Sequence, residues 1–378
     1  MLVYLFEVLG MKSSTNSNHD PTQSEQIRAS YLDRVGAQHA TALKDRMSQC
    51  SNYVREIHKT KTIVTNVVTS NSQEEHEVLC LMTVLTESRI ERLLKLFRVW
   101  PGCITLVVHL PKERHDEIQQ YITNVQNATH HNRTTVHFVY SDDLELTPIN
   151  FLRNVALQWT TSEFVFYVDV DLIPSKNLHQ QILQSIKSEN FQKNLKSALI
   201  IPAFAMKEQS SSDFPQSKKE LLIKFSRMEA EPFYAKEYAP AYGPTNYRKW
   251  VQSSTVYQIR VGCYNEFEPY MVVRNPRRKD VQNETEAVQF YSEAFIHRFI
   301  NKAIYFTDLC IRHFQFFVEP EGFLLHQPHT SQRSDLRNKI RKFDIKQCAY
   351  ASYKMHYESE GRRRGYTSSH WTVTKTFY

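Results

Sequence analysis

The feature that most constrains the fold is a regular alternation of apolar runs and amphipathic segments between residues 77 and 206. The apolar runs predict five strands, at residues 77–85, 103–110, 135–140, 164–168 and 198–206. Segments with apolar residues at helical spacing stand between them, at residues 87–100, 112–125, 148–159 and 175–187. Strands that are apolar throughout and alternate with helices are typical of a largely parallel sheet with helices on both faces. We therefore predict an α/β fold.

The flanking segments differ from this pattern. Residues 12–30 are rich in Ser, Asn, Thr and Gln, and we predict that residues 1–75 form a polar stem with one helix near 24–58. After residue 206 the chain is aromatic and mixed, with strand-like segments at 270–273 and 322–326. We expect this region to pack on the first half, so that residues 76–350 form one domain and 351–378 a C-terminal tail.

Bulk composition restricts the partner only weakly. The 378 residues carry a formal net charge of +7, which suits an anionic ligand without choosing between nucleic acid, a membrane surface and a nucleotide. We expect no nucleic-acid partner, because no RNA-module signature, zinc-finger spacing or dense basic stripe is present. Neither G-x-x-x-x-G-K-[ST] nor G-x-G-x-x-G occurs, so a nucleotide would not be held by a glycine-rich loop.

Cysteines and glycosylation signals favour a lumenal or extracellular compartment. The six cysteines contain no C-x-x-C pair, so a zinc site is improbable, and their number permits disulfides of unknown connectivity. N-x-[ST] sequons begin at Asn127, Asn132 and Asn283. The apolar N-terminal stretch, MLVYLFEVLGM, is shorter than the about 20 residues that span a membrane.

Two carboxylates follow the fourth apolar run directly. Asp169 and Asp171 lie on the same side of an extended chain, where they repel each other unless they are neutralised. They also stand at the carboxyl end of a strand, where parallel sheets bind ligands. One interpretation is a turn that caps a helix near Ser175. We favour the other, a divalent cation whose remaining positions hold a nucleotide diphosphate.

A third candidate ligand follows a later apolar run. In GFLLHQPHT, the run ends in His326 and then His329. An imidazole that completes an Asp-x-Asp site suits manganese, which accepts oxygen and nitrogen ligands. Taken alone, either histidine is more often an ordinary hydrogen-bonded residue.

Four segments in this order resemble glycosyltransferase family 49. They are PINFLRNVAL at 148–157, FVFYVDVDLIPS at 164–175, FEPYMVVR at 267–274 and FLLHQPH at 323–329. That family includes β-1,4-glucuronyltransferases and the glucuronyltransferase domains of LARGE-type enzymes. The resemblance covers roughly residues 76–350.

The resemblance implies a GT-A type fold, a UDP-sugar donor, a divalent metal (usually Mn²⁺), a glycan or glycoprotein acceptor and inversion at the anomeric centre. It also implies a Golgi protein with an N-terminal membrane anchor, which this sequence does not display. Asp169, Asp171 and His326 match the family's metal ligands. Arg153 and Asn154, together with Asp169, match residues near the donor site.

Further matches concern catalysis. Glu268, in the EPY segment, could contact the acceptor, act as the base or only bond to the backbone. As a base it is our choice, with Glu293 and Asp308 as competitors. Counting back from His326 without a gap aligns residues 295–302, FIHRFINK, with the family motif F-V-G-x-G-x-[ND]-[KR]. Its last two residues, Asn301 and Lys302, match and are assigned to catalysis and donor binding.

The same segment departs from the family motif at both glycines. His297 and Phe299 replace them and should reshape that part of the cleft.

The sequence therefore leaves two candidate functions. The first is a metal-dependent transferase that moves a sugar, glucuronic acid, from UDP to a glycan hydroxyl. The second is a catalytically inactive relative that acts as a glycan-binding or chaperone-like partner.

Overall fold

The structure is a computed structural model that describes residues 67–69, 77–141, 147–192, 194–206, 214–263, 266–276, 290–292 and 301–327. Most of the predicted stem, the helix at 24–58 and the tail at 351–378 lie outside the described residues. So do five residues singled out above: Asn283, Glu293, His297, Phe299 and His329.

A nine-stranded sheet forms the centre of the molecule, in the order β1-β4-β3-β2-β5-β11-β7-β12-β10. Its first half is parallel: β4 (Thr134–Tyr140), β3 (Cys103–Leu110), β2 (Leu79–Thr86) and β5 (Phe164–Tyr167). A short strand, β1 (Val67–Thr69), pairs antiparallel with β4 at the edge. The predicted strands of this half and their parallel arrangement are confirmed.

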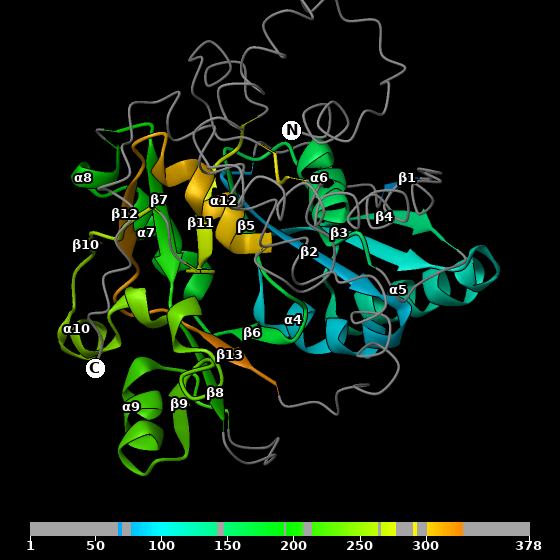
Figure 1. Ribbon diagram of the computed structural model, residues 1–378. Coiled ribbons are helices and arrows are strands. Elements are labelled where there is room, and N and C mark those ends of the chain that lie inside the picture. The colour runs from blue at the N-terminus through cyan, green and yellow to red at the C-terminus, as the bar shows by residue number, and fades with distance from the viewer. Residues whose placement is uncertain are drawn as a thin grey trace, which may run out of the picture.

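The second half of the sheet is mixed. β11 (Tyr270–Arg274) lies antiparallel between β5 and β7 (Ser197–Ile201). Beyond them, β12 (Gln315–Val318) is parallel to β7, and β10 (Tyr257–Ile259) is antiparallel to β12. A strand from the C-terminal half therefore sits in the middle of the sheet, between two strands that come earlier in the chain (Figure 1).

A smaller sheet contains β6 (Leu172–Pro174), β13 (Leu324–His326), β8 (Ala203–Met206) and β9 (Ala230–Pro232), in that order. The single strand predicted at 198–206 is wrong. It is two strands, β7 and β8, which belong to different sheets. Pro202 stands between them, and a proline has no N–H with which to continue a hydrogen-bonded ladder.

Helices cover both faces of the large sheet. Apolar residues of α4 (Leu93–Val99), α5 (His115–Thr129) and α7 (Leu178–Ile186) join one core cluster. Those of α6 (Ile149–Trp159) and α12 (Asn301–Cys310) join the other. The helix predicted at 87–100 begins as a 3₁₀ segment, η1 (Glu87–Arg92). The remaining elements are η2 (Lys112–Arg114), α8 (Glu189–Gln192), α9 (Lys218–Ser226), η3 (Ala239–Ala241), η4 (Gly243–Thr245) and α10 (Tyr247–Gln252).

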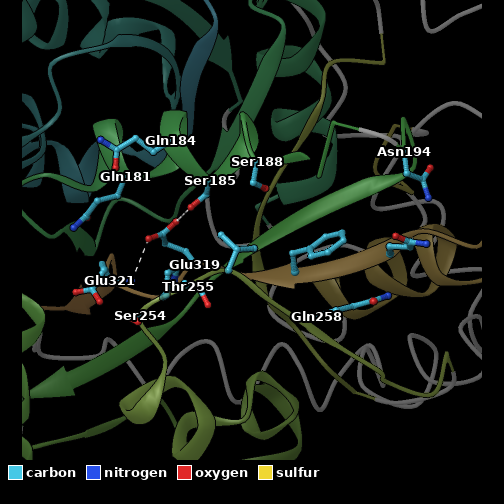
Figure 2. Close-up of a pocket in the computed structure, with 14 residues that line it drawn as sticks. Gln181, Gln184, Ser185, Ser188, Asn194, Ser254, Thr255, Gln258, Glu319 and Glu321 are labelled. Carbon is cyan, nitrogen blue, oxygen red and sulfur yellow. Dashed lines mark hydrogen bonds between the residues drawn. The ribbon is translucent and has the colours of Figure 1, made fainter. Parts of the chain in front are cut away.

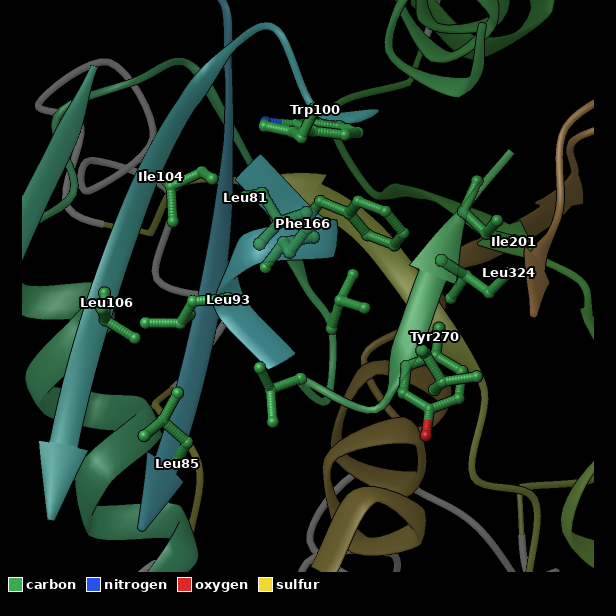
Figure 3. Close-up of a cluster of buried hydrophobic side chains, with 14 of the residues drawn as sticks. Leu81, Leu85, Leu93, Trp100, Ile104, Leu106, Phe166, Ile201, Tyr270 and Leu324 are labelled. Atoms are coloured by element: carbon green, nitrogen blue, oxygen red, sulfur yellow. The ribbon is translucent and has the colours of Figure 1, made fainter. Parts of the chain in front are cut away.

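The alternation of side chains along the strands separates these two clusters. Leu81 of β2 and Phe166 of β5 point to the same face, where they meet Leu93 of α4 and Trp100 (Figure 3). All four are at most 1% exposed. Burial of each such side chain stabilises the fold by roughly 1.5–3 kcal/mol. The strand that leads into the Asp-x-Asp segment is therefore held in place by a packed core.

Disulfides fix two places in the described part of the chain. Cys80 and Cys103 join β2 to β3, and Cys263 and Cys310 join the segment after β10 to the end of α12. Within this part no cysteine is free. Such bonds persist in oxidising compartments, which agrees with the lumenal or extracellular expectation. No helix among the described segments combines the length and apolar character of a membrane span.

Candidate active site

The Asp-x-Asp segment is the turn by which the chain leaves the large sheet and enters the small one. The N–H of Val168 still bonds to β2, and the N–H of Leu172 bonds back to the carbonyl of Asp169 at 2.9 Å. Leu172 then starts β6. The two carboxylates remain partly accessible, with side chains 29% and 18% exposed. The segment is thus a turn, as one interpretation held, and its carboxylates are also available to a ligand.

Asp169 is the centre of a polar cluster. Its Oδ2 accepts hydrogen bonds from Nζ of Lys302 at 3.0 Å and from the hydroxyl of Tyr270 at 2.6 Å. Its Oδ1 accepts one from the hydroxyl of Tyr167 at 2.6 Å and lies 3.7 Å from Nη2 of Arg153. Burial alone would raise the pKa of Asp169, but Lys302, Arg153 and the two hydroxyls outweigh it and hold that pKa below its ordinary value. Asp169 is therefore an anion at neutral pH.

Arg153 connects this cluster to two helices. Its side chain is only 2% exposed, and Nη1 donates to Oδ1 of Asn150 at 2.8 Å and to Oδ1 of Asn301 at 2.6 Å. The guanidinium lies 4.3 Å from the ring centroid of Tyr167. Burial acts to lower the pKa of Arg153, yet its neighbours raise that pKa above the ordinary value. Arg153 is a fixed buried cation that joins α6 to the first residue of α12.

Asn154 is hydrogen-bonded to the backbone of Tyr291, and its predicted role in donor binding stays a prediction. Its Nδ2 donates to the carbonyl of Tyr291 at 2.8 Å, and its Oδ1 accepts from the N–H of Tyr291 at 2.8 Å. The ring of Tyr291 lies over Arg153, with 5.2 Å between the ring centroid and Cζ. In this structure Asn154 therefore holds a segment that covers the site.

Lys302 contacts both Asp169 and two tyrosine side chains, Tyr242 and Tyr270. Its Nζ also donates to the hydroxyls of Tyr270 at 2.9 Å and Tyr242 at 3.4 Å, and it lies 4.1 Å from the ring centroid of Tyr270. The rings of Tyr242 and Tyr270 stack, with 6.1 Å between their centroids. The ammonium group of Lys302 therefore lies beside two tyrosine side chains, at the carboxyl ends of the strands.

Asp171 lies apart from this cluster and meets different partners. Its Oδ2 accepts a hydrogen bond from Nη1 of Arg89 at 2.9 Å, and Nε2 of His326 lies 3.9 Å from the same oxygen. The register of the small sheet, in which Leu172 pairs with His326, creates this approach. Two of the three predicted metal ligands therefore meet, although they are 155 residues apart in the sequence (326 minus 171).

A divalent cation fits this pair better than it fits all three residues. One carboxylate and one imidazole are suitable ligands for Mn²⁺, and phosphate oxygens and water can complete its shell. The described residues contain no group of three His, Cys, Asp or Glu side chains that could hold an ion. The reason is that the Asp169 carboxylate is directed to Lys302 and Tyr270 instead. Metal binding by Asp169 stays a prediction.

Glu268 is placed beside the same cluster. Its backbone N–H bonds to the carbonyl of Ala241 at 2.8 Å, and its side chain is half-buried. Across the described segments, no hydrogen bond reaches its carboxylate. Burial raises the pKa of Glu268, with Lys302 and Arg153 opposing in part. Its competitor Asp308 lies within α12 and is 5% exposed, which suits a base for a solvent-borne acceptor less well.

Sequence reasoning did not identify Arg89, Tyr167, Tyr242 and Tyr270 as parts of the site. The sequence contained a signal for two of them, Tyr167 and Arg89. Tyr167 precedes Asp169 by two residues and so lies on the same side of an extended strand. Arg89 stands just after β2, at the carboxyl end of a neighbouring parallel strand. Nothing local indicates Tyr242, which reaches the site only through tertiary packing.

Comparison with known proteins decides the family. Residues 144–358, more than half of the chain, match the family model described as glycosyl-transferase for dystroglycan. The chain belongs to this family. The resemblance inferred from four short segments is thereby confirmed, and with the order of strands in the large sheet it confirms the GT-A type fold.

The chain is also similar in sequence to individual glycosyltransferases. The chain is 28% identical over 294 residues to the xylosyl- and glucuronyltransferase LARGE2 of Mus musculus, covering 77% of this chain and 40% of that protein. It is 27% identical over 288 residues to LARGE1 of Homo sapiens, covering 75% and 36%. The chain thus spans less than half the length of these curated relatives.

Solved structures are more remote. One of GalNAc-T7 with UDP, GalNAc and Mn²⁺ aligns with a TM-score of 0.44 and 12% identity, over 79% of this chain and 54% of that one. A similarity at this level carries no argument about the site.

Proposed function

We propose that this chain transfers a sugar, glucuronic acid, from a UDP donor to a hydroxyl of a glycan acceptor, with inversion and with a divalent metal. The observation that carries the proposal is the meeting of His326 with Asp171, two residues along the chain from Asp169, which pairs with the fixed cations Arg153 and Lys302. Anionic and cationic groups are thus adjacent at the carboxyl ends of the strands, where α/β sheets bind nucleotides. Membership of the glycosyltransferase family agrees with this chemistry.

The proposed donor is anionic, with two negative charges on its diphosphate and one on its glucuronate carboxylate, and the cations of the site suit it. Lys302 is 10% exposed and lies within α12, with its Nζ 3.0 Å from Oδ2 of Asp169. Arg153 and Asn301 act behind it: their 2.6 Å hydrogen bond supports a positioning role for Asn301, because it orients the buried guanidinium. Bound at Asp171 and His326, Mn²⁺ would supply Lewis-acid stabilisation of the diphosphate leaving group.

Glu268 is our candidate for the base. In the proposed step the acceptor oxygen forms a bond to the anomeric carbon, the bond from that carbon to UDP breaks, and the hydroxyl proton moves to a carboxylate oxygen of Glu268. Its accessible carboxylate and raised pKa support this role, since a base works best with a pKa near the working pH.

We place the reaction in the Golgi lumen, on a glycan or glycoprotein acceptor. The two disulfides support an oxidising compartment. Two sequon asparagines, Asn127 and Asn132, are exposed, as N-glycosylation requires. A membrane anchor remains an expectation from the family.

One observation favours the second candidate, an inactive relative that binds glycans or assists a partner. Both carboxylates already have cationic partners, Lys302 on Asp169 and Arg89 on Asp171. A metal would have to displace or share the contact with Arg89. A protein that never binds metal would keep both ion pairs as structural links.

The experiment is UDP release from a panel of UDP-sugars, with and without Mn²⁺, and metal-dependent UDP binding by calorimetry. We expect release from UDP-glucuronate that a chelator abolishes. Asp169→Asn combined with Asp171→Asn should abolish metal-dependent UDP binding and leave the circular dichroism unchanged. His326→Ala should weaken Mn²⁺ binding more than His329→Ala or the exposed His313→Ala.

Each outcome decides between the candidates. UDP binding without turnover of any donor would favour the inactive relative. If metal-dependent UDP binding is also missing, the transferase proposal is wrong.

A further inference from the structure

A cavity lies at the edge of the large sheet, and neither Asp169 nor Asp171 lines it. It has a volume of about 990 Å³ and is enclosed by α7, by β12 and β10, and by the loop that follows β12 (Figure 2). None of the residues that line it belongs to the candidate active site. Its size is at the upper end of the roughly 300–1,000 Å³ of small-molecule sites.

The walls of this cavity are polar but carry few charges. Five amide side chains line it: Gln181, Gln184, Asn194, Gln258 and Gln315. Hydroxyl groups of serine and threonine stand between them. The charged residues in the described lining are two glutamates, Glu319 and Glu321, and no lysine or arginine is among them. An amide both donates and accepts hydrogen bonds, so the walls can pair with hydroxyl groups in either direction.

A buried carboxylate forms the fixed part of the wall. Glu319 is 1% exposed, and its Oε1 accepts hydrogen bonds from the N–H groups of Glu321 at 3.1 Å and Gly322 at 3.3 Å. The hydroxyl of Ser185 donates to Oε2, a contact drawn in Figure 2. On the other side, Nε1 of Trp250 donates to the carbonyl of Glu319 at 2.9 Å. The loop is therefore held in one shape without a ligand.

Other polar groups at the cavity are not used by the fold. Gln258 of the edge strand β10 and Gln315 of the neighbouring β12 are exposed. Among the described residues, Oε1 of Gln181 and Oγ of Ser188 are buried without a hydrogen-bond partner. Unpaired buried polar atoms are uncommon, because each loses its hydration. The apolar residues of the lining are Val256, which is half-buried, and Phe317 and Pro320, which are buried.

We infer that this cavity is a binding site for a neutral oligosaccharide. Amides, hydroxyls and a carboxylate match the dense hydroxyl groups of a sugar, and the half-buried side chain of Val256 offers an apolar contact to its C–H groups. Two glutamates without a lining cation disfavour phosphates and uronates, which would meet like charges. The site is distinct from the proposed transferase centre, and it can hold a neutral part of a glycan whether or not the chain is an active enzyme.

The test is saturation-transfer NMR with a panel of neutral oligosaccharides and, as a charged comparison, glucuronate-bearing oligosaccharides of equal length. The variant is Gln258→Ala with Gln315→Ala, because both side chains are exposed and their loss should not disturb the core. Gln120→Ala, on the exposed face of α5, is the matched control. No donor, metal or turnover is needed, so failure of the proposed transferase function would not affect this result.

We expect at least one neutral oligosaccharide to bind, to bind about three- to tenfold more weakly to the double variant, and to be unaffected by Gln120→Ala. UDP binding should be the same in all three proteins. Absence of binding across the neutral panel would overturn the inference, and so would binding that the double variant leaves unchanged. Equal binding of glucuronate-bearing oligosaccharides would overturn the assigned ligand class.

Discussion

Arg89 donates a hydrogen bond of 2.9 Å from Nη1 to Oδ2 of Asp171, across 82 residues of sequence. The two meet because β2 and β5 are neighbours in the sheet and both end at the same edge. The same Asp171 oxygen lies 3.9 Å from His326. The guanidinium therefore occupies one side of the pair that we assign to a metal.

Replacing Arg89 by Gln should strengthen binding of Mn²⁺ alone by about two- to fivefold, because a partly exposed ion pair of about 0.2–1 kcal/mol no longer competes. UDP binding in the presence of Mn²⁺ should weaken, since one cation near the diphosphate is lost. Calorimetric titration with each ligand separates the two effects. Arg98→Gln, exposed on α4, should change neither. Unchanged Mn²⁺ affinity in Arg89→Gln would show that the ion pair and the metal do not share Asp171.

Glu268→Gln should lower kcat by about 10²–10⁴-fold while UDP binding is retained, because the amide cannot accept the acceptor proton. Burial raises the pKa of Glu268 above its ordinary value of 4.5, so the wild-type rate should fall as pH drops through that raised value. This acidic limb should be missing from the residual activity of the variant. Glu237→Gln, an exposed change, should have the wild-type profile. A wild-type rate in Glu268→Gln would exclude it as the base.

Lys218 should matter for stability rather than for chemistry. Its Nζ donates to the carbonyls of Trp250 at 2.8 Å, Pro320 at 2.8 Å and Ser253, which ties α9 to α10 and to the loop after β12. Lys218→Met removes this donor from all three carbonyls, of which that of Trp250 keeps a bond from the N–H of Ser253 at 3.2 Å, and should lower the free energy of unfolding by about 2–5 kcal/mol. Urea denaturation measures it. Lys219→Met, exposed on the same helix, should stay within about 0.5 kcal/mol of wild type, and equal values for the two would show that the buried contacts contribute nothing.

His137 should make stability depend on pH. It is 0% exposed on β4, its ring lies 5.5 Å from that of Trp159, and burial lowers its pKa from 6.5 to about 4. Between these two values the unfolded chain binds a proton that the folded protein excludes. This histidine should therefore lower stability as pH falls from 6.5 to about 4, by at most about 1.4 kcal/mol per pH unit.

His137→Phe removes the titrating group and keeps a ring against Trp159. Urea unfolding at several pH values gives the slope of the free energy of unfolding against pH. In the variant this slope should be smaller by about one proton. It should not vanish, because His131 and His179 also have lowered pKa values and continue to contribute. The exposed His130→Phe is the control. An identical slope in wild type and His137→Phe would mean that His137 is protonated in the folded protein.

Local pattern determined the first half of the fold. The runs that became β2, β3, β4 and β5 are apolar on both faces, and a strand buried on both faces requires that composition wherever it lies. The helical spacing of apolar residues predicted where the helices lie. It did not predict that residues 87–92 form the 3₁₀ segment η1, because the spacing of apolar residues does not distinguish a 3₁₀ turn from an α turn. Asp169 and Asp171 were found because polar residues at the end of such a run are conspicuous.

Tertiary structure alone decided the rest. The insertion of β11 between β5 and β7, the division of one apolar run at Pro202, and both disulfide pairings join segments that no local period relates. The same holds for Tyr270 and Lys302, which reach Asp169 from 101 and 133 residues away. A sequence pattern reports which side of its own element a residue faces. Which distant element lies opposite depends on how the whole core packs, and that packing directed Asp169 to Lys302 and left Asp171 to His326.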